Sequence, residues 1–257
     1  MTSALIGYSG FVGGTLAKSE HFDLLVNRAN LQSLRDQQLD RLVCAGLPAA
    51  KWLANEKPEE DAENTRRLEA ALRTVQASTV VVVSTIDVYP CTSGVDELYD
   101  CRLMPNHSYG RHRLEFEHFV RDRFPHASVV RLPALFGPGL KKNVLYDLLH
   151  DNRLERINSA SRFQWYPLDR LQGDLRIVEA LRLPLVNLFT EPLETGVLVS
   201  KLFPDKFVGQ CPDRPASYDL YTRYGAHFGG NGRYVMSASS LMEALRDFVR
   251  AERGALS

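Results

Sequence analysis

A glycine-rich segment that follows a short apolar run constrains the fold of this chain more than any other feature. Residues 4–6 are apolar, glycines stand at positions 7, 10 and 13, and a helix-compatible stretch follows directly. Gly7 permits a sharp turn after the strand, Gly10 lets the backbone approach a pyrophosphate, and Gly13 lets the helix pack close to the strand. The segment therefore predicts a phosphate cradle at a helix N-terminus, although a tight turn without a ligand has the same pattern.

Apolar runs of strand length alternate with longer amphipathic stretches, which is typical of parallel strands linked by helices. Strands are predicted at residues 4–6, 23–26, 41–45, 79–84, 128–132 and 186–189. Helices are predicted at residues 58–74, 108–123 and 241–252. Only about fifteen residues separate the second strand from the third, so a short or irregular connection is expected there. The pattern predicts an α/β fold, a Rossmann-like doubly wound parallel sheet with a smaller C-terminal substrate lobe.

The division of the chain follows from where this alternation weakens. Residues 1–136 are predicted to form the dinucleotide-binding core. Residues 137–257 are turn-rich and are predicted to form mainly a substrate-binding lobe, with residues 183–204 returning to the core. Ligands of open α/β sheets bind outside the carboxyl ends of the strands, so a lobe at that edge would supply substrate contacts.

The balance of charges excludes several classes of partner. The chain has 257 residues, of which 31 are basic and 31 acidic. A net charge of zero favours neither nucleic acid nor an anionic membrane. No basic region precedes a long apolar segment, which predicts neither a signal peptide nor a transmembrane span. We expect a cytoplasmic protein with a small-molecule substrate and no nucleic-acid or membrane partner.

Cysteine and histidine spacing predicts no metal site. Four cysteines are scattered along the chain, at Cys44, Cys91, Cys101 and Cys211. This spacing fits a reducing compartment better than a disulfide framework. Three histidines fall in or beside one predicted helix, at His107, His112 and His118. Their spacing does not bring three ligands to one face, so we expect them to be surface residues.

A second informative site lies where the strand at residues 79–84 ends. The strand delivers the hydroxyls of Ser84 and Thr85 to the ligand-binding edge, and Tyr109 opens a predicted helix farther along. Arg113 follows Tyr109 by one turn on the same face. A neighbouring positive charge favours phenolate, which a tyrosine needs to exchange a proton with a substrate hydroxyl near neutral pH.

Five motifs together carry a resemblance to a known family. They are Gly7-x-x-Gly10-Phe11-Val12-Gly13, Glu63-Asn64-Thr65, Ser84-Thr85-x-Asp87-Val88-Tyr89, Tyr109-Gly110-Arg111-x-Arg113 and Arg131-Leu132-Pro133-x-Leu135-Phe136-Gly137-Pro138-Gly139. In this order and spacing the chain resembles, over most of its length, the extended short-chain dehydrogenase/reductase family of the NAD-dependent epimerase/dehydratase type. Members of that family modify nucleotide sugars.

The resemblance implies a nicotinamide cofactor, NADP or NAD, with Tyr109 as the acid/base and Thr85 holding the substrate oxygen. Arg113 stands where the family usually has lysine. It would keep the charge beside the phenol and contact the nicotinamide ribose, but arginine does not release its proton, so a relay through it would be lost. The implied cofactor contacts are Gly7, Ser9, Gly10, Phe11, Val12, Gly13, Arg28, Ala45, Gly46, Leu132 and Pro133.

Two further positions bear on the cofactor and the reaction. No carboxylate follows the second strand. Arg28 stands there and could contact the 2′-phosphate of NADP, which favours NADP over NAD. The alternative is that Arg28 is a solvated loop residue. Asp87 matches the position of a proton-abstracting acid in the dehydratases, but Ile86 stands where those enzymes have a second acid. Dehydration is therefore disfavoured, and Asp87 could equally be a backbone acceptor. Lys51 and Trp52 follow the third strand on the ligand side and could line the pocket.

These observations predict an oxidoreductase that passes a hydride between NADP or NAD and a carbon of a nucleotide-linked sugar. One alternative is an epimerase that retains its cofactor. Another, which Arg113 leaves open, is a catalytically inactive dinucleotide-binding sensor. The family's habit of dimerising through the tyrosine helix makes a homodimer an expectation.

Overall fold

The computed structural model describes residues 2–209 and 214–256, and its chain divides into two compact units. The first unit takes its residues from Met1–Pro90, Leu98–Leu132 and Arg170–Val186. The second takes its residues from Cys91–Glu97, Pro133–Asp169 and Asn187–Ser257. Cys211 lies outside the described residues.

The first unit is built on a six-stranded sheet with the order β2-β1-β3-β4-β5-β9. Its strands are β1 (Ser3–Ile6), β2 (Leu24–Val26), β3 (Gln38–Cys44), β4 (Gln76–Thr85), β5 (Ala127–Leu132) and β9 (Leu185–Asn187). Its helices are α1 (Phe11–Ser19), α2 (Lys51–Glu56), α3 (Pro58–Arg73), α4 (Ser108–Arg123) and α6 (Leu171–Ala180), with short 3-10 turns η1 (Arg28–Leu34) and η2 (Ile86–Val88). The pairings from β2 to β5 are all parallel. The predicted fold class is confirmed.

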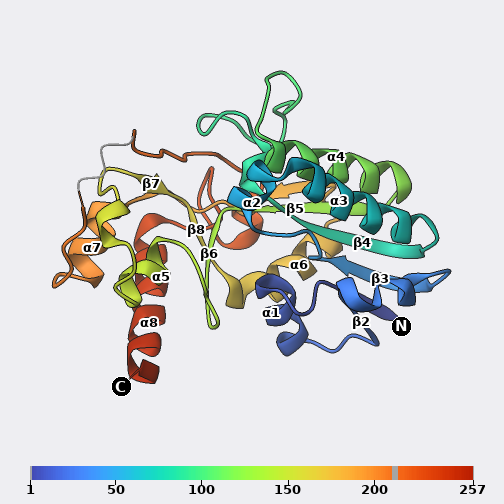
Figure 1. The fold of residues 1–257 in the computed structure, drawn as a ribbon, viewed down its shortest axis with the longest axis horizontal. Helices are drawn as coiled ribbons and strands as arrows, with labels where there is room; N and C mark the ends of the chain where they lie inside the picture. The colour runs from blue at the N-terminus through green and yellow to red at the C-terminus, as the bar shows by residue number, and fades with distance from the viewer. Residues whose placement is uncertain (1, 210–213, 257) are drawn as a thin grey trace. The chain divides into compact units, whose positions relative to one another are not determined.

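Helices cover both faces of this sheet: α3 and α4 lie along one face, and α1 and α6 lie along the other (Figure 1). Helix α3 begins with Pro58 and carries three acidic residues in its first turn, where they suit the helix dipole. Leu68 and Leu72 on its inner face join Phe116 and Val120 of α4 in a core with β1, β3 and β4. Burial of these apolar side chains fixes α4, and with it the residues at its N-terminus, against the sheet.

The sequence prediction placed all six strands of this sheet within a few residues of their observed positions. The short connection after β2 is the irregular turn η1, as predicted. The segment that returns to the first unit differs from the prediction. It is Arg170–Val186, which contains α6, whereas residues 187–204 belong to the second unit. Helix α6 returns because its side chains contact the sheet unit: Gln172 donates to the Ser19 carbonyl oxygen, and Glu179 accepts from Arg41.

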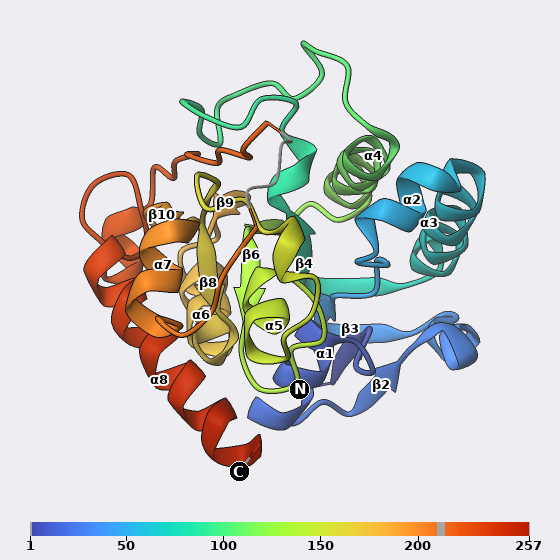
Figure 2. The same ribbon diagram turned by 60° about the vertical axis from the view of Figure 1, so that its left-hand side comes forward.

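The second unit contains two small two-stranded sheets, β6 with β8 in parallel and β7 with β10 in antiparallel. Its strands are β6 (Ala134–Phe136), β7 (Arg162–Phe163), β8 (Trp165–Pro167) and β10 (Leu193–Glu194). Its helices are α5 (Val144–Leu149), α7 (Thr195–Leu202) and α8 (Ala238–Leu256), with the short turns η3 (Leu154–Arg156), η4 (Leu168–Arg170) and η5 (Gly225–Phe228). Helix α8 packs beside α7, and its apolar face forms a core with Phe136 and Trp165 (Figure 2).

The segment Cys91–Glu97 belongs to the second unit because Glu97 accepts hydrogen bonds from residues of that unit. One Glu97 carboxylate oxygen accepts from the Asn187 amide and the Thr222 hydroxyl, and the other accepts from the Arg223 amide. Within the described part of the chain, no helix is long and apolar enough to cross a membrane.

Candidate active site

The glycine turn after β1 has the geometry that the sequence predicts for a phosphate cradle. Gly7 has a φ of +90°, and a Cβ there would overlap the backbone of Ala45. A Cβ at Gly13 would overlap the Gly7 carbonyl group. Only glycine at position 13 therefore allows helix α1 to pack this close to the turn. Gly10 is the N-cap of α1, and no side chain caps the first turn. Backbone amides at an uncapped helix N-terminus fit the pyrophosphate of a dinucleotide.

The end of β2 presents amides and a cation and has no carboxylate. Asn27 and Asn30 form a reciprocal capping box at the start of η1. The Asn27 side-chain amide donates to the Tyr8 hydroxyl at 3.1 Å, which links the glycine turn to the end of β2. Arg28, the first residue of η1, is exposed. This surface is suited to an anion such as a ribose phosphate, and the segment Asn27–Asn30 has no carboxylate to accept from a ribose diol.

Thr85 and Tyr109 meet at the carboxyl end of β4. Thr85 is the last residue of the strand, and its hydroxyl accepts from the Asp87 amide at 3.2 Å. Tyr109 lies in the first turn of α4 and is 7% exposed, and Thr85 is close enough to its side chain to lower the pKa of the phenol. The sequence predicted both residues as site residues, and the structure brings their hydroxyls together.

The N-terminus of α4 is held in place by close backbone packing. A Cβ at Gly110 would overlap the Asp87 carbonyl oxygen and the Asn106 side chain. Asn106 donates to the carbonyl oxygens of Asp87 and Val88, and Asn55 of α2 accepts from the Tyr109 amide at 3.0 Å. These contacts fix Tyr109 relative to β4. Sequence analysis missed Asn55 and Asn106, because an isolated asparagine gives no signal of a long-range contact.

Arg113 is buried beneath the Tyr109 ring. Its side chain is 2% exposed, and its guanidinium carbon lies 4.1 Å from the Tyr109 ring centroid. The guanidinium donates to the Asp61 carboxylate of α3 and to the Pro48 carbonyl oxygen. These partners differ from the nicotinamide ribose that the sequence analysis assigned to Arg113.

Asp61 also accepts from His112, at 2.8 Å. The expectation that His112 is a surface residue is wrong: it is 4% exposed and bonded to this carboxylate. Burial alone would raise the pKa of Asp61, but the hydrogen bonds from Arg113 and His112 outweigh it and hold that pKa below its usual value. Asp61 is therefore an ionised, buried anchor for α4.

The acidity of Tyr109 differs from the sequence-based expectation. Burial raises the pKa of the phenol and is the largest effect. Arg113 opposes it, as predicted, and so do the hydrogen bond with Thr85 and the charge of Lys51, whereas the charge of Asp87 adds to the rise. The net pKa lies above its ordinary value, because a nearly dry site disfavours the phenolate more than these neighbours stabilise it.

Asp87 is paired with a cation from another helix. Lys51, the first residue of α2, donates to the Asp87 carboxylate at 2.6 Å. His107 is half-buried and caps α4 through its ring, where Nδ1 accepts from the Gly110 amide. Burial lowers the pKa of His107, and the charge of Lys51 lowers it further, so the ring is neutral at neutral pH.

The remaining predicted residues lie in different surroundings. Ser84 is buried and donates to Glu117, which also pairs with Arg131, so this hydroxyl serves the packing of α4 on the sheet. Ala45 and Gly46 follow β3 and are half-buried, and the Leu132 side chain is 2% exposed. Pro133 begins a segment of the second unit. Ser9, Phe11 and Val12 are exposed or half-buried in the glycine turn and α1.

Cys44 lies in the apolar core of the sheet unit. Burial raises the pKa of the Cys44 thiol to about 11, which makes it unreactive at neutral pH. Among residues 2–209 and 214–256, no group of three or more His, Cys, Asp or Glu side chains is arranged to hold a metal ion.

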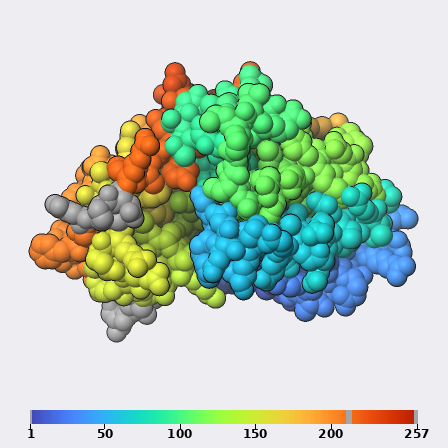
Figure 3. All heavy atoms as spheres, turned by 45° about the horizontal axis from the view of Figure 1, so that its top comes forward, coloured from blue at the N-terminus to red at the C-terminus, as the bar shows by residue number. Residues whose placement is uncertain are grey.

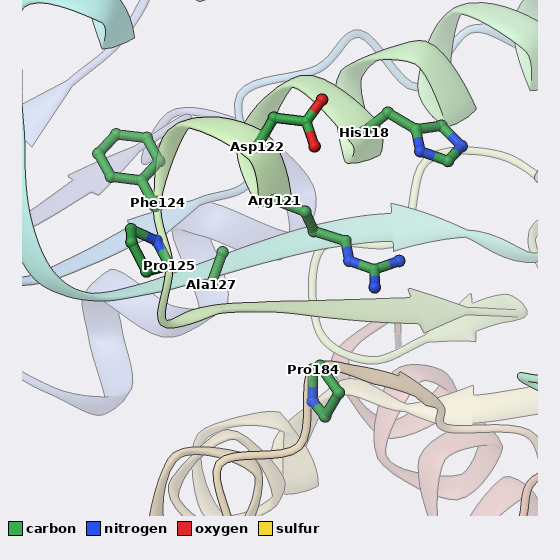
Figure 4. Close-up of a pocket in the computed structure, with 7 residues that line it drawn as sticks. All are labelled: His118, Arg121, Asp122, Phe124, Pro125, Ala127 and Pro184. Carbon is green, nitrogen blue, oxygen red and sulfur yellow. The ribbon is translucent and has the colours of Figure 1, made fainter.

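A surface hollow in the first unit lies away from these residues. It is lined by His118, Arg121, Asp122, Phe124, Pro125, Ala127 and Pro184 (Figure 4). Its walls come from the C-terminal half of α4 and the start of β5, which is the amino end of that strand. Thr85 lies at the carboxyl end of the neighbouring strand β4, where open α/β sheets bind ligands. The hollow is therefore not the candidate active site.

A parallel sheet with a glycine turn after its first strand and a Thr–Tyr pair at its carboxyl edge defines a Rossmann-like α/β protein. Residues 10–159 match the family model described as "NAD dependent epimerase/dehydratase family". The chain belongs to this family, as its motifs predicted. No curated protein sequence matches the chain significantly.

Solved structures share this fold along nearly the whole chain at low sequence identity. One is a dTDP-4-dehydrorhamnose reductase from Bacillus anthracis in complex with NADP, with TM-score 0.74, 14% identity, and 97% of this chain and 99% of that chain covered. Another is a UDP-N-acetylglucosamine 4-epimerase from Methanobrevibacter ruminantium in complex with UDP-N-acetylmuramic acid, with TM-score 0.75, 12% identity, and 97% of each chain covered. A third is MoeE5 in complex with UDP-glucuronic acid and NAD, with TM-score 0.75, 17% identity, and 99% of this chain and 100% of that chain covered.

Proposed function

We propose that this protein is an NAD(P)-dependent oxidoreductase that transfers a hydride between a nicotinamide cofactor and a carbon of a nucleotide-linked sugar. The observation that carries the proposal is the close approach of the Tyr109 and Thr85 side chains at the carboxyl end of β4. The phenol of Tyr109 and the hydroxyl of Thr85 can together bind one substrate oxygen, and the phenol can exchange its proton with that oxygen. The family assignment and the nucleotide-sugar and NAD(P) complexes of the similar structures support this chemistry.

The cofactor would be held by the glycine turn. The uncapped first turn of α1 would bind the pyrophosphate, and Arg28 would meet the 2′-phosphate of NADP. When bound, the nicotinamide supplies or accepts the hydride. We propose NADP as the preferred cofactor, because the end of β2 offers Arg28 and no carboxylate.

In this mechanism Tyr109 donates its proton to the sugar oxygen during reduction and accepts it during oxidation. Thr85 donates to or accepts from the same oxygen and fixes its position. Arg113 stabilises the ring of Tyr109 from its face and, through Asp61, holds the start of α4 in place.

Calorimetry with NAD and NADP, followed by a panel of UDP- and dTDP-linked sugars monitored by nicotinamide absorbance, tests the proposal. We expect Tyr109→Phe to lower hydride transfer by about 100-fold or more while cofactor affinity stays the same. Arg121→Gln, at an exposed position of α4 beside the hollow described above, is the control and should retain activity. Binding of neither cofactor would refute the proposal.

The same experiment separates two alternatives. Purification with tightly held dinucleotide and interconversion of two sugar epimers without net reduction would identify an epimerase. Cofactor binding without turnover of any sugar, in the wild-type protein and in Tyr109→Phe alike, would identify a sensor.

A further inference from the structure

The guanidinium of Arg113 is engaged by groups other than the Asp87 carboxylate. Its side chain is 2% exposed, and two of its nitrogens donate to Asp61 and to the Pro48 carbonyl oxygen. An arginine keeps its proton at every physiological pH. A cation that compensates the charge of the Asp87 carboxylate must therefore come from another element.

Helix α2 brings such a cation to the site. Lys51 and Asn55 are four residues apart on α2 and therefore share one face. Asn55 accepts from the Tyr109 amide at 3.0 Å, and Lys51 donates to Asp87 at 2.6 Å. The two contacts fix the ammonium of Lys51 beside the strand end that carries Thr85. Figure 3 shows α2 and α3 at the surface next to α4.

The pair formed by Lys51 and Asp87 is only partly closed to solvent. The Lys51 side chain is 40% exposed, and the Asp87 side chain is 17% exposed. Solvent therefore reaches the ammonium, while the carboxylate lies deeper in the site. Trp52, the next residue on α2, is 67% exposed and lies outside this contact.

The charged and titratable groups around the Tyr109 hydroxyl come from three elements and the segment before α4. Arg113 lies under the ring, Asp87 is on η2, Lys51 is on α2, and the neutral His107 ring is centred 6.3 Å from the Tyr109 ring. Asp87 opposes formation of a phenolate because like charges repel. Lys51 is the group bonded to Asp87 that compensates this charge.

We propose that Lys51 is a positioning residue of the active site, whose ammonium neutralises Asp87 so that the Tyr109 hydroxyl faces an ion pair and not a lone carboxylate. The proposal rests on the proposed function and deepens it by naming the residue that makes proton exchange at Tyr109 feasible. Lys51 acts through Asp87 and Tyr109, and it does so beside the charge of Arg113, which lies under the Tyr109 ring.

The test measures the phenolate fraction of Tyr109 at about pH 10, near the ordinary tyrosine pKa, by NMR of protein labelled at tyrosine Cζ. Tyr109→Phe identifies the resonance. We expect Lys51→Met to lower the phenolate fraction by roughly tenfold, because the ammonium that pairs with Asp87 is removed. We expect Asp87→Asn to raise it, and the double variant Lys51→Met/Asp87→Asn to lie close to the wild type. Lys51→Arg should restore the wild-type value.

Lys57→Met is the matched control, because Lys57 directly follows α2 and its side chain is 58% exposed, with its ammonium 3.9 Å from the Glu60 carboxylate. It should leave the Tyr109 phenolate fraction unchanged. A Lys51→Met protein with the wild-type phenolate fraction, or one that Lys51→Arg does not restore, overturns the proposal. Circular dichroism is used to check that each variant is folded. We expect Lys51→Met to fold, because the Lys51 side chain is 40% exposed.

The pH profile of hydride transfer provides a second readout. In the oxidative direction, where Tyr109 must be phenolate, the acid limb of kcat/KM should move to higher pH in Lys51→Met, with kcat/KM lower by roughly tenfold at neutral pH. If the wild-type protein transfers no hydride, the proposed function fails, whereas the NMR measurement still decides the role of Lys51.

Discussion

The guanidinium of Arg113 lies over the face of the Tyr109 ring, with its central carbon 4.1 Å from the ring centroid. The two residues are one helical turn apart, so the sequence alone places them on one face of α4. Their contact is a cation stacked on a ring, and the cation is anchored by Asp61 from α3. The pair therefore joins the candidate acid/base to the packing of two helices, and substitutions here should change stability as well as chemistry.

Asp61→Asn should destabilise the protein by about 3–5 kcal/mol at neutral pH, because it leaves the buried Arg113 charge without its counter-ion. The folded-state pKa of Asp61 is below its unfolded value, so its contribution is present above about pH 4 and is lost as the pH falls through the folded-state pKa. Urea unfolding at neutral pH and at about pH 3 checks both points. The gap between wild type and variant should narrow in acid.

Glu63→Gln is the control for this measurement. Glu63 lies on the same helix with a side chain that is 46% exposed, and its pairs with Arg66 and Arg67 should contribute under about 1 kcal/mol. If Glu63→Gln lost as much stability as Asp61→Asn, burial of the Asp61 carboxylate would not be the cause of the Asp61→Asn effect.

Arg113→Lys should destabilise the protein by about 1–3 kcal/mol, although the charge is kept. A lysine ammonium cannot reproduce a planar guanidinium that stacks on Tyr109 while it bonds both Asp61 and the Pro48 carbonyl oxygen. Thermal and urea unfolding measure the loss. An Arg113→Lys protein as stable as the wild type would show that these contacts contribute little.

Gly110→Ala should destabilise the protein by about 1–3 kcal/mol and reduce any activity that depends on Tyr109. The added methyl group would overlap the Asp87 carbonyl oxygen, which is backbone and cannot move aside, so the first turn of α4 would shift. Gly173→Ala is the matched control, because Gly173 also lies in a helix but has open space at its Cβ position. It should stabilise the protein by about 0.5–1 kcal/mol.

Much of the sheet unit follows from local sequence, since buried parallel strands are apolar runs and glycines mark the turn after β1. The glycine turn was predictable for the same reason: Gly7 and Gly13 are required by contacts within a few residues or with the adjacent strand. The proximity of Thr85 and Tyr109 followed from the strand-end rule and from the family motifs.

Long-range contacts were not predictable in this way. Asp61 lies 52 positions before Arg113, and Lys51 lies 36 positions before Asp87. A carboxylate in the first turn of α3 has an adequate local explanation as a partner of the helix dipole, so nothing marks it as a buried anchor. The net pKa of Tyr109 depends on burial, which the spacing of Tyr109 and Arg113 does not reveal.

Arg28→Ala should weaken NADP binding by about tenfold or more and leave NAD binding unchanged, because only NADP carries the 2′-phosphate that a charged donor at the end of β2 would bind. Arg35→Ala at the other end of η1 is the control, since the Arg35 side chain is 81% exposed and pairs with Asp36. Calorimetry of both cofactors against both variants, at low and raised salt, measures the effect. Equal losses for NAD and NADP in Arg28→Ala would assign Arg28 to the shared pyrophosphate and remove the argument for NADP.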